Sequence, residues 1–330
     1  MPETATSVRE ISFGEAIREA LAEELRRDTT IVLMGEDVAE AGTTFKVLKG
    51  LVDEFGTDRI IDTPISEEGF VGACFGAAWM GERPVAELQF ADFISCCFDQ
   101  IVTVGAKTHW RSGIKLPLVL RAPYGGGVRG GPFHASSPEG WFVGTAGLKV
   151  VCPGTVEDAY GLLRAAVEDD DPVLYFEHKG LYRRLKAEAP DTSTRTPIGK
   201  SLVRREGGDV TVVTYGSGVD LALRAADGLA GEAEVEVVDL RTVWPLDLEP
   251  VLESLAKTSR VLMLQEASRS IGAGNLVLSR LAREGFELLD APPALHAPVD
   301  TPVPFAPELE DGYMPSVDSV TTALRDLLDY

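Results

Sequence analysis

Two adjacent acids open a run of small and apolar residues in Asp62-Thr-Pro-Ile-Ser-Glu-Glu-Gly-Phe-Val-Gly-Ala-Cys-Phe-Gly-Ala-Ala-Trp-Met-Gly81. Ser66 is a candidate N-cap, because a serine hydroxyl can accept a hydrogen bond from the first turn of a helix. The small residues that follow predict a buried helix that a neighbouring backbone or a flat ligand can approach closely. Glu67 and Glu68 are then either carboxyls whose pKa burial raises for proton transfer, or ordinary first-turn acids that complement the helix dipole.

The composition is that of a globular protein with room for two domains. The chain has 330 residues, of which 45% are hydrophobic and 25% charged. Its net charge of −21 opposes binding to nucleic acid or to an anionic membrane surface. Four cysteines form neither a disulfide framework nor a paired metal-ligand spacing, and no export signal or membrane-spanning run is recognisable. We therefore expect a reducing, cytoplasmic setting.

Short apolar runs alternate with helical patterns along the first half of the chain. Ser12-Phe-Gly-Glu15 has the form of a capping box and predicts an amphipathic helix after it. We expect further helices at residues 92–110 and 156–167, and strands at residues 31–34, 84–90, 116–121, 148–152 and 172–176. This alternation predicts a mostly parallel sheet with helices on both faces.

The second half repeats the alternation after a polar segment. Residues 183–200 have the composition of a linker. Beyond it we expect strands at residues 210–215, 235–239, 260–264 and 286–289, and helices ending at residue 229, at residues 248–257 and 271–284, and from residue 316. A proline-rich passage, residues 291–307, is expected to run over the surface. The chain is thus predicted to be an α/β protein of two domains, residues 1–190 and 191–330.

A glycine-rich loop follows one of the predicted strands. Gly125-Gly-Gly-Val-Arg-Gly130 has the spacing of a dinucleotide fingerprint, but Gly131-Pro132 comes next, where no helix begins cleanly. We interpret the segment as a mobile or sharply folded loop that delivers His134 to a cleft. His134 is then either a general acid or base near neutral pH or an exposed loop histidine.

The acidic run Glu168-Asp-Asp-Asp-Pro172 ends a predicted helix, where negative charge opposes the helix dipole. The run is either a solvated turn or part of a site in which carboxylates and helix-terminal carbonyls bind a cation. In the second case Asp169 and Asp171 are the candidate ligands.

Several runs share their order and spacing with one known family, from Ile11 to Tyr330. They are Gly35-Glu-Asp-Val38, Asp62-Thr-Pro-Ile-Ser-Glu67, Ala86-Glu-Leu-Gln-Phe-Ala-Asp-Phe93, Asp99-Gln-Ile-Val102, Ser136-Ser-Pro-Glu139, Gly147-Leu-Lys-Val-Val151 and Asp239-Leu-Arg241. Together they closely resemble the beta subunit of the thiamine diphosphate-dependent decarboxylating component of 2-oxo acid dehydrogenases, of the pyruvate and branched-chain types. The resemblance implies a pyrimidine-binding, transketolase-like parallel-sheet domain followed by a transketolase C-terminal-like α/β domain.

The resemblance also implies roles for individual residues. Glu67 is expected to contact N1′ of the aminopyrimidine ring and to share a proton with it, with Gln89 and Phe93 as further cofactor-binding residues. Phe93 would stack on the pyrimidine, and His134 would orient the substrate and assist acyl transfer to a lipoyl group. A structural potassium ion is implied at Leu118, Ala166, Val167, Asp169 and Asp171.

Partners are implied in the same way. The chain lacks Gly-Asp-Gly with a following Asn, which binds magnesium and diphosphate in thiamine enzymes, so an alpha subunit is expected to supply it in an α2β2 heterotetramer. The assembly would decarboxylate pyruvate or a branched-chain 2-oxo acid and pass the acyl group to lipoyl-lysine of an acyltransferase core. The alternatives are the beta subunit of an acetoin-cleaving enzyme, a non-catalytic subunit of this fold, and a stand-alone dinucleotide oxidoreductase.

Two features bear on substrate preference. Many relatives read His-His-Ser-Gln where this chain has Phe133-His134-Ala135-Ser136, so substrate placement or loop packing is expected to differ. The run Ala86 to Phe93 is closer to the branched-chain and broad-specificity members than to the mitochondrial pyruvate type. An extra methylene in an apolar pocket changes selectivity by only about 10- to 200-fold, so this run does not fix the substrate.

Overall fold

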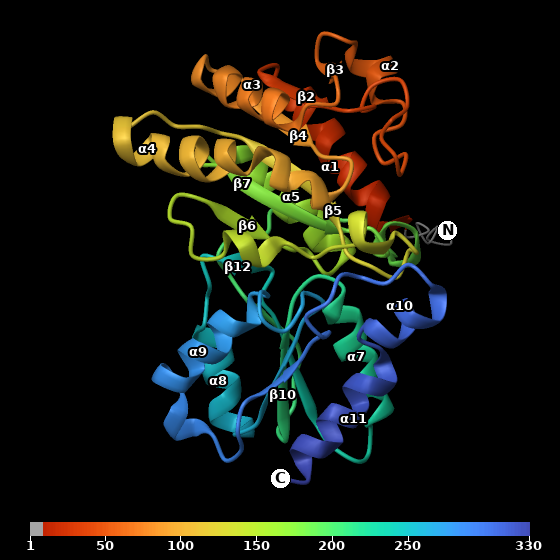
Figure 1. Ribbon diagram of the computed structural model, residues 1–330, viewed down its shortest axis with the longest axis vertical. Coiled ribbons are helices and arrows are strands. Elements are labelled where there is room, and N and C mark those ends of the chain that lie inside the picture. Colours follow the sequence, from red (N-terminus) through yellow and green to blue (C-terminus); the bar gives the residue numbers. More distant parts are fainter. Residues whose placement is uncertain (1–8) are drawn as a thin grey trace, which may run out of the picture.

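Parallel strands connected by helices build the largest of the three sheets in the described residues, which lies in the upper half of Figure 1. The computed structural model describes residues 9–330. The strand order is β12-β6-β7-β5-β4-β2-β3, and every pair is parallel except β12 with β6. The strands are β2 (Ile31–Gly35), β3 (Ile60–Asp62), β4 (Arg83–Glu87), β5 (Val119–Tyr124), β6 (Lys149–Val151), β7 (Val173–His178) and β12 (Thr242–Trp244). The carboxyl ends of β2, β3, β4, β5 and β7 therefore share one edge, where α/β proteins bind ligands.

Helices cover both faces of this sheet, as predicted. On one face α1 (Phe13–Arg27) packs against α5 (Val156–Glu168), and the predicted capping box at Ser12 and Glu15 opens α1. On the other face α3 (Glu67–Trp79) packs against the segment predicted as one helix from 92 to 110. That segment is a 3₁₀-helix η1 (Ala91–Cys97), a π-helix η2 (Gln100–Gly105) and an α-helix α4 (Ala106–Ser112) in succession. Shorter elements are α2 (Leu51–Phe55), η3 (Gly131–Phe133) and η4 (Glu139–Phe142).

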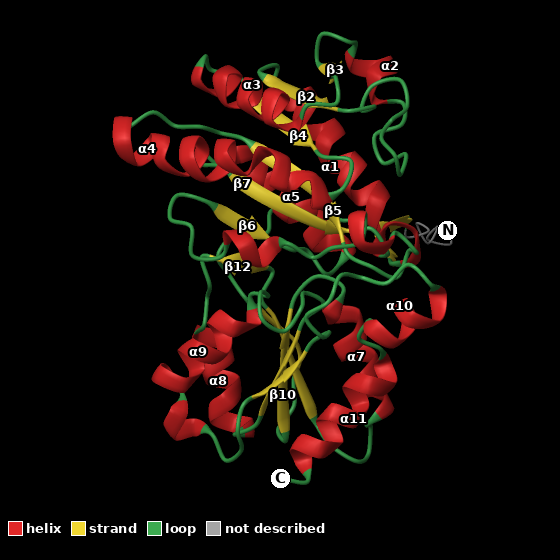
Figure 2. Ribbon diagram, in the orientation of Figure 1, coloured by secondary structure: helices red, strands yellow, loops and turns green. Residues whose placement is uncertain are grey.

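The second sheet has the order β14-β13-β10-β11-β9, with only β9 antiparallel. Its strands are β9 (Leu202–Arg205), β10 (Val210–Thr214), β11 (Val235–Asp239), β13 (Val261–Leu264) and β14 (Ala294–His296). Figure 2 shows one helix pair on each side of it, α8 (Glu249–Thr258) with α9 (Gly274–Glu284), and α7 (Gly218–Gly228) with α11 (Val317–Leu328). The short helix α10 (Pro307–Tyr313) lies beside the junction of the two halves.

Two expectations for the second half were wrong. The strand predicted at 286–289 is a 3₁₀-helix η5 (Phe286–Leu288), in which the side chain of Phe286 is 70% exposed. The strand lies further on, as β14, within the passage expected to run over the surface. The neighbouring prolines argued against a strand in this passage. Proline is nevertheless tolerated at the edges and ends of a sheet, and β14 is an edge strand.

The predicted linker also contains regular structure. After helix α6 (Leu181–Arg184), residues Lys186–Glu188 form β8, which pairs antiparallel with β1 (Glu10–Ser12). The first part of the linker thus packs back onto the first domain. The exact boundary at residue 190 stays a prediction.

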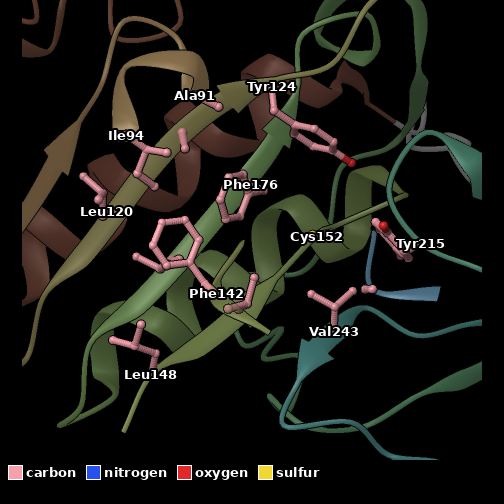
Figure 3. Close-up of a cluster of buried hydrophobic side chains, with 14 of the residues drawn as sticks. Ala91, Ile94, Leu120, Tyr124, Phe142, Leu148, Cys152, Phe176, Tyr215 and Val243 are labelled. Atoms are coloured by element: carbon pink, nitrogen blue, oxygen red, sulfur yellow. The ribbon is translucent and has the colours of Figure 1, made fainter. Parts of the chain in front are cut away.

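One buried core crosses from the first domain into the second. Figure 3 shows Tyr215 and Val243, from the second half of the chain, in one cluster with apolar side chains of the first half such as Phe142 and Phe176. The hydroxyl of Tyr215 donates a hydrogen bond to Oε1 of the buried Glu139 at 2.6 Å. Burial of this shared apolar surface holds the two domains together.

Candidate active site

Acidic residues gather where β2 and β3 end. Glu36 and Asp37 follow β2 directly, and Glu67 is the first residue of α3, after β3. Glu36 is only 5% exposed, and its Oε1 has no hydrogen-bond partner among residues 9–330. Burial, and next the charge of Glu67, raise the pKa of the Glu36 carboxyl. A carboxyl with a raised pKa was one of the two interpretations of the acids Glu67 and Glu68, and the structure shows a raised pKa at the neighbouring Glu36.

The two acids of the opening stretch have different surroundings. Glu67 is half-buried, whereas Glu68 is exposed. Burial raises the pKa of the Cys97 thiol to about 12, and the charge of Glu67 adds to the rise, so Glu67 lies close to helix η1. Ser66 occupies the N-cap position, but its hydroxyl accepts no hydrogen bond from the helix, so the predicted side-chain cap was wrong.

Helix α3 is not buried all round, contrary to the expectation. Its apolar side chains Phe70, Val71, Cys74, Phe75 and Ala78 face the core. The opposite side carries Gly69, Ala73 and Gly76, all exposed, and it is flanked by Ile65 and Met80, which are 83% and 85% exposed. A helix that is apolar on every side is normally buried, so this exposed face has the character of a contact surface.

His134 lies against two aromatic rings. Its ring centroid is 4.6 Å from that of Phe90 and 5.8 Å from that of Phe93, both in edge-to-face geometry. The Oδ1 of Asp92 accepts a hydrogen bond from the backbone N–H of Ser136 at 3.1 Å, which ties the histidine loop to η1. The structure thus brings Phe93 and His134 together. Phe133, which stands where many relatives carry histidine, is exposed and Ala135 is buried.

Gln89 joins the acidic group instead. It follows β4, and its Nε2 donates a hydrogen bond to Oδ2 of Asp37 at 3.0 Å. Helix η1 connects the two parts of the site, because it carries Phe93, which faces His134, and Cys97, which lies near Glu67. The segments that follow β2, β3, β4 and β5 at one sheet edge therefore supply the carboxylates, the aromatic rings and His134.

The glycine loop after β5 does not open a helix that could bind a dinucleotide. A three-residue 3₁₀-helix, η3, follows it. Gly125 has a φ of +92°, and a Cβ there would lie 2.1 Å from Nε2 of His178. Glycine is required because the backbone passes so close to the ion pair between His178 and Glu266, whose Nε2 and Oε2 are 2.7 Å apart.

Protein cations already bind the residues of the implied potassium site. The guanidinium of Arg83 donates to the carbonyls of Val167 at 3.1 Å and Asp169 at 3.0 Å. The carboxylate of Asp169 pairs with Lys149 at 2.6 Å, and that of Asp171 lies 2.5 Å from His109. The carbonyls of Leu118 and Ala166 accept backbone hydrogen bonds. The potassium assignment stays a prediction, and Arg83 would have to share its two carbonyls with such an ion.

No helix within residues 9–330 has the length and apolar character needed to cross a bilayer. No group of three or more His, Cys, Asp or Glu side chains in the same residues is arranged to hold a metal ion.

Comparisons with known proteins agree with this architecture. Residues 9–184 match the pyrimidine binding domain of transketolase, and residues 199–320 match the transketolase C-terminal domain. A solved structure described as a split gene transketolase, an inactive β4 tetramer, superposes with a TM-score of 0.79 at 24% identity, covering 97% of this chain and 98% of that one. The chain is therefore a two-domain protein of the transketolase-like class, which confirms the predicted α/β fold.

Relatives that align with this chain over nearly their whole length identify its family within the transketolase-like class. The 2-oxoisovalerate dehydrogenase subunit beta of Bacillus subtilis is 44% identical, over 97% of this chain and 99% of the relative. The acetoin:2,6-dichlorophenolindophenol oxidoreductase subunit beta of Bacillus subtilis is 43% identical (97% and 98%), and the pyruvate dehydrogenase E1 component subunit beta of Staphylococcus epidermidis is 40% identical (97% and 99%). The chain belongs to this family of thiamine-dependent 2-oxo acid and acetoin dehydrogenase beta subunits.

Sequence reasoning missed three polar residues that follow the carboxyl ends of parallel strands. Glu36 was part of a run that carried the resemblance, but no role was assigned to it. No role was predicted for Lys179, which follows β7, or for Glu266, which follows β13. Their positions directly after predicted buried strands were the available signal, because side chains there point to the ligand-binding edge of such sheets.

Proposed function

We propose that this chain is the beta subunit of an α2β2 enzyme that decarboxylates pyruvate or a branched-chain 2-oxo acid and acylates a lipoyl-lysine. The observation that carries the proposal is the placement of Glu67, half-buried at the sheet edge beside a second carboxyl, that of Glu36, whose pKa is raised. Such a pair can hold a proton where a ring nitrogen must receive one. The similarity to 2-oxoisovalerate and pyruvate dehydrogenase beta subunits supports the substrate class.

The residues present fit one half of a thiamine diphosphate site. Glu36 has an unpartnered buried oxygen, Phe93 offers a ring next to His134, and α3 has an exposed face of small residues. When bound, thiamine diphosphate supplies the electron sink that decarboxylation requires. In this chain Glu67 would hold a proton at N1′, Phe93 would pack on the pyrimidine, and Gln89 would keep Asp37 in place through its 3.0 Å hydrogen bond. His134 would orient the substrate.

An alpha subunit would supply magnesium and diphosphate binding. The exposed face of α3, with Gly69, Ala73, Gly76 and Met80, supports a tight contact with another chain, because small residues let backbones approach closely. The lipoyl-bearing acyltransferase core is part of the same proposal. It is supported by the family of the chain alone.

A matched pair of variants tests the proposed role of Glu67. The chain is co-expressed with its alpha subunit and loaded with magnesium and thiamine diphosphate. Turnover of pyruvate and of 3-methyl-2-oxobutanoate is then followed with 2,6-dichlorophenolindophenol as electron acceptor. Glu67→Gln should lower kcat by roughly 100-fold or more, and Glu68→Gln should leave it near the wild-type value. Near-normal turnover of Glu67→Gln would refute the role.

One observation supports the alternative of an acetoin-cleaving enzyme, namely the 43% identity to the acetoin oxidoreductase subunit beta. The same assay decides it, since acetoin as the only accepted substrate would favour it over the 2-oxo acids. Failure of the assembled complex to bind thiamine diphosphate would instead indicate a non-catalytic subunit.

The potassium ion needs its own test. If it binds at the carbonyls of Leu118, Ala166 and Val167, potassium chloride should raise the Tm relative to choline chloride at equal ionic strength. An equal Tm in the two salts would leave Arg83 and Lys149 as the cations of this cluster.

A further inference from the structure

A cavity of about 530 Å³ lies between the two domains. Its walls come from the glycine loop at Gly126 to Val128, from the residues after β7, from the start of α7 and from the loop after β13. Its volume is in the range of sites that hold small molecules. Glu67, Phe93 and His134 are not among the residues that line it.

Lys179 provides an uncompensated charge in this cavity. Its side chain is 5% exposed, yet Nζ has no hydrogen-bond partner and no ion pair among residues 9–330. The nearest aromatic contact is with Phe90, whose ring centroid is 5.7 Å from Nζ. A buried ammonium without a partner is costly, so native proteins normally pair it. Burial accordingly lowers the pKa of Lys179 to about 8, partly offset by Asp92, Glu266 and Glu310.

Glu266, the acidic residue in the cavity wall, does not provide the missing partner for Lys179. The carboxylate of Glu266 is already bound by four donors, namely His178 Nε2, Gly126 N–H, Ser217 Oγ and Ser137 Oγ. On the other side, Arg183 and Arg184 stand at the wall with exposed side chains. Arg184 has only a 3.5 Å contact with Asp220. The cavity therefore keeps positive charge in a chain whose net charge is −21.

Apolar side chains form much of the remaining lining. They are Phe45, Leu221, Leu264, Met314 and Pro315, and polar residues such as Thr44 and Gln265 also line the cavity. A pocket that combines an apolar wall with one unpaired charge selects a ligand that has both an apolar body and one charge of opposite sign.

We propose that this interdomain cavity is a binding site for a small organic anion, with its acidic group on Lys179 and its hydrocarbon part against Phe45 and Leu221. The ligand contacts the glycine loop, whose continuation carries His134. The proposal concerns binding alone and does not depend on the enzymatic activity of the chain.

Calorimetric titration of the full chain tests the proposal with three probes. Hexanoate combines a carboxylate with an apolar chain, hexan-1-ol has only the chain, and inorganic phosphate has only the charge. We expect hexanoate to bind at least roughly tenfold more tightly than either of the others. Equal or tighter binding of phosphate would overturn the organic part of the proposal, and no detectable binding of hexanoate would overturn it entirely.

Variants locate the binding. Lys179→Met keeps the aliphatic stem and should weaken hexanoate binding by roughly tenfold or more. Leu221→Trp fills the apolar wall with Lys179 unchanged and should weaken it as well. The control is Lys107→Met, which removes an exposed lysine on α4 and should leave the affinity unaltered. Unchanged affinity in both cavity variants would show that hexanoate binds elsewhere and would refute the site.

Discussion

His178 and Glu266 join the two domains at the end of β7, with 2.7 Å between Nε2 and Oε2. Glu266 follows β13 of the second sheet, and it also accepts hydrogen bonds from Gly126 N–H at 2.7 Å and from Ser217 Oγ at 3.0 Å. Burial opposes ionisation of this carboxyl, but the histidine and the hydrogen bonds prevail and lower its pKa to about 2. One carboxylate thus fixes a strand end, the glycine loop and the start of α7.

Glu266→Gln should therefore destabilise the protein in a pH-dependent way. The folded-state pKa lies below the ordinary value of 4.5, so the stabilisation is complete above about pH 4.5 and is lost as the pH falls toward about 2. The loss at pH 7 should be about 3 kcal/mol, measured by urea denaturation. The control is Glu284→Gln, which breaks an exposed pair with Arg280 and should leave the urea midpoint nearly unchanged. Equal effects of the two variants would contradict the argument.

Glu139→Gln should stabilise the protein above neutral pH, whereas Glu266→Gln should destabilise it. Burial raises the pKa of Glu139 to about 7, although the hydrogen bond from Tyr215 favours the charged form. A raised pKa means that stability is greatest below about pH 4.5 and falls as the pH rises through about 7. The neutral amide removes this dependence, so the variant should exceed the wild type by up to about 3 kcal/mol at pH 8 and match it near about pH 4. A less stable variant at pH 8 would show that the carboxylate is needed.

The parallel sheets were predictable because their strands are buried on both faces and read as continuous apolar runs, such as Val210 to Thr214. Strand β12 was not, because Thr242–Trp244 is three residues long and pairs with β6 of the other domain. Its pairing depends on how the domains pack. Nothing in its local sequence carries that information.

The candidate site also combines residues that the sequence could predict with residues that it could not. Residue type and position pointed to Glu67, Phe93 and His134 once the family was recognised, and the structure places Phe93 against His134. The unpartnered atoms of Glu36 and Lys179 could not be predicted, because their burial arises from loops and strands distant in the sequence. An unsatisfied polar group is a property of the folded chain alone.

Lys179→Met should raise stability at neutral pH. Because the folded-state pKa is lowered from 10.5 to about 8, the folded protein disfavours the charged amine, and this cost persists below about pH 8 and disappears as the pH rises toward 10.5. Removing the charge should add up to about 3 kcal/mol at pH 7, and Lys107→Met should change the free energy of unfolding by less than about 0.5 kcal/mol. Destabilisation by Lys179→Met would instead indicate a structural role for its attraction to Asp92.

Gly76→Leu should weaken assembly with the alpha subunit and leave the chain itself intact. Gly76 is exposed on α3, and a Cβ there would have no atom within 4 Å, so leucine fits the isolated chain. Replacing a helical glycine should even stabilise α3 by about 0.8 kcal/mol. A leucine in a closely packed contact typically costs about 1–3 kcal/mol, which weakens association roughly 10- to 100-fold.

The matched control for that variant is Gly228→Leu on α7, which is also exposed and free of neighbours within 4 Å. Analytical ultracentrifugation of the mixed subunits measures assembly, and thermal denaturation of each chain measures folding. We expect the two variants to have similar Tm values and to differ only in binding the alpha subunit. If Gly76→Leu assembles as well as Gly228→Leu, the exposed face of α3 is not the surface that meets the partner, and the half-site must be completed from another side of Glu67.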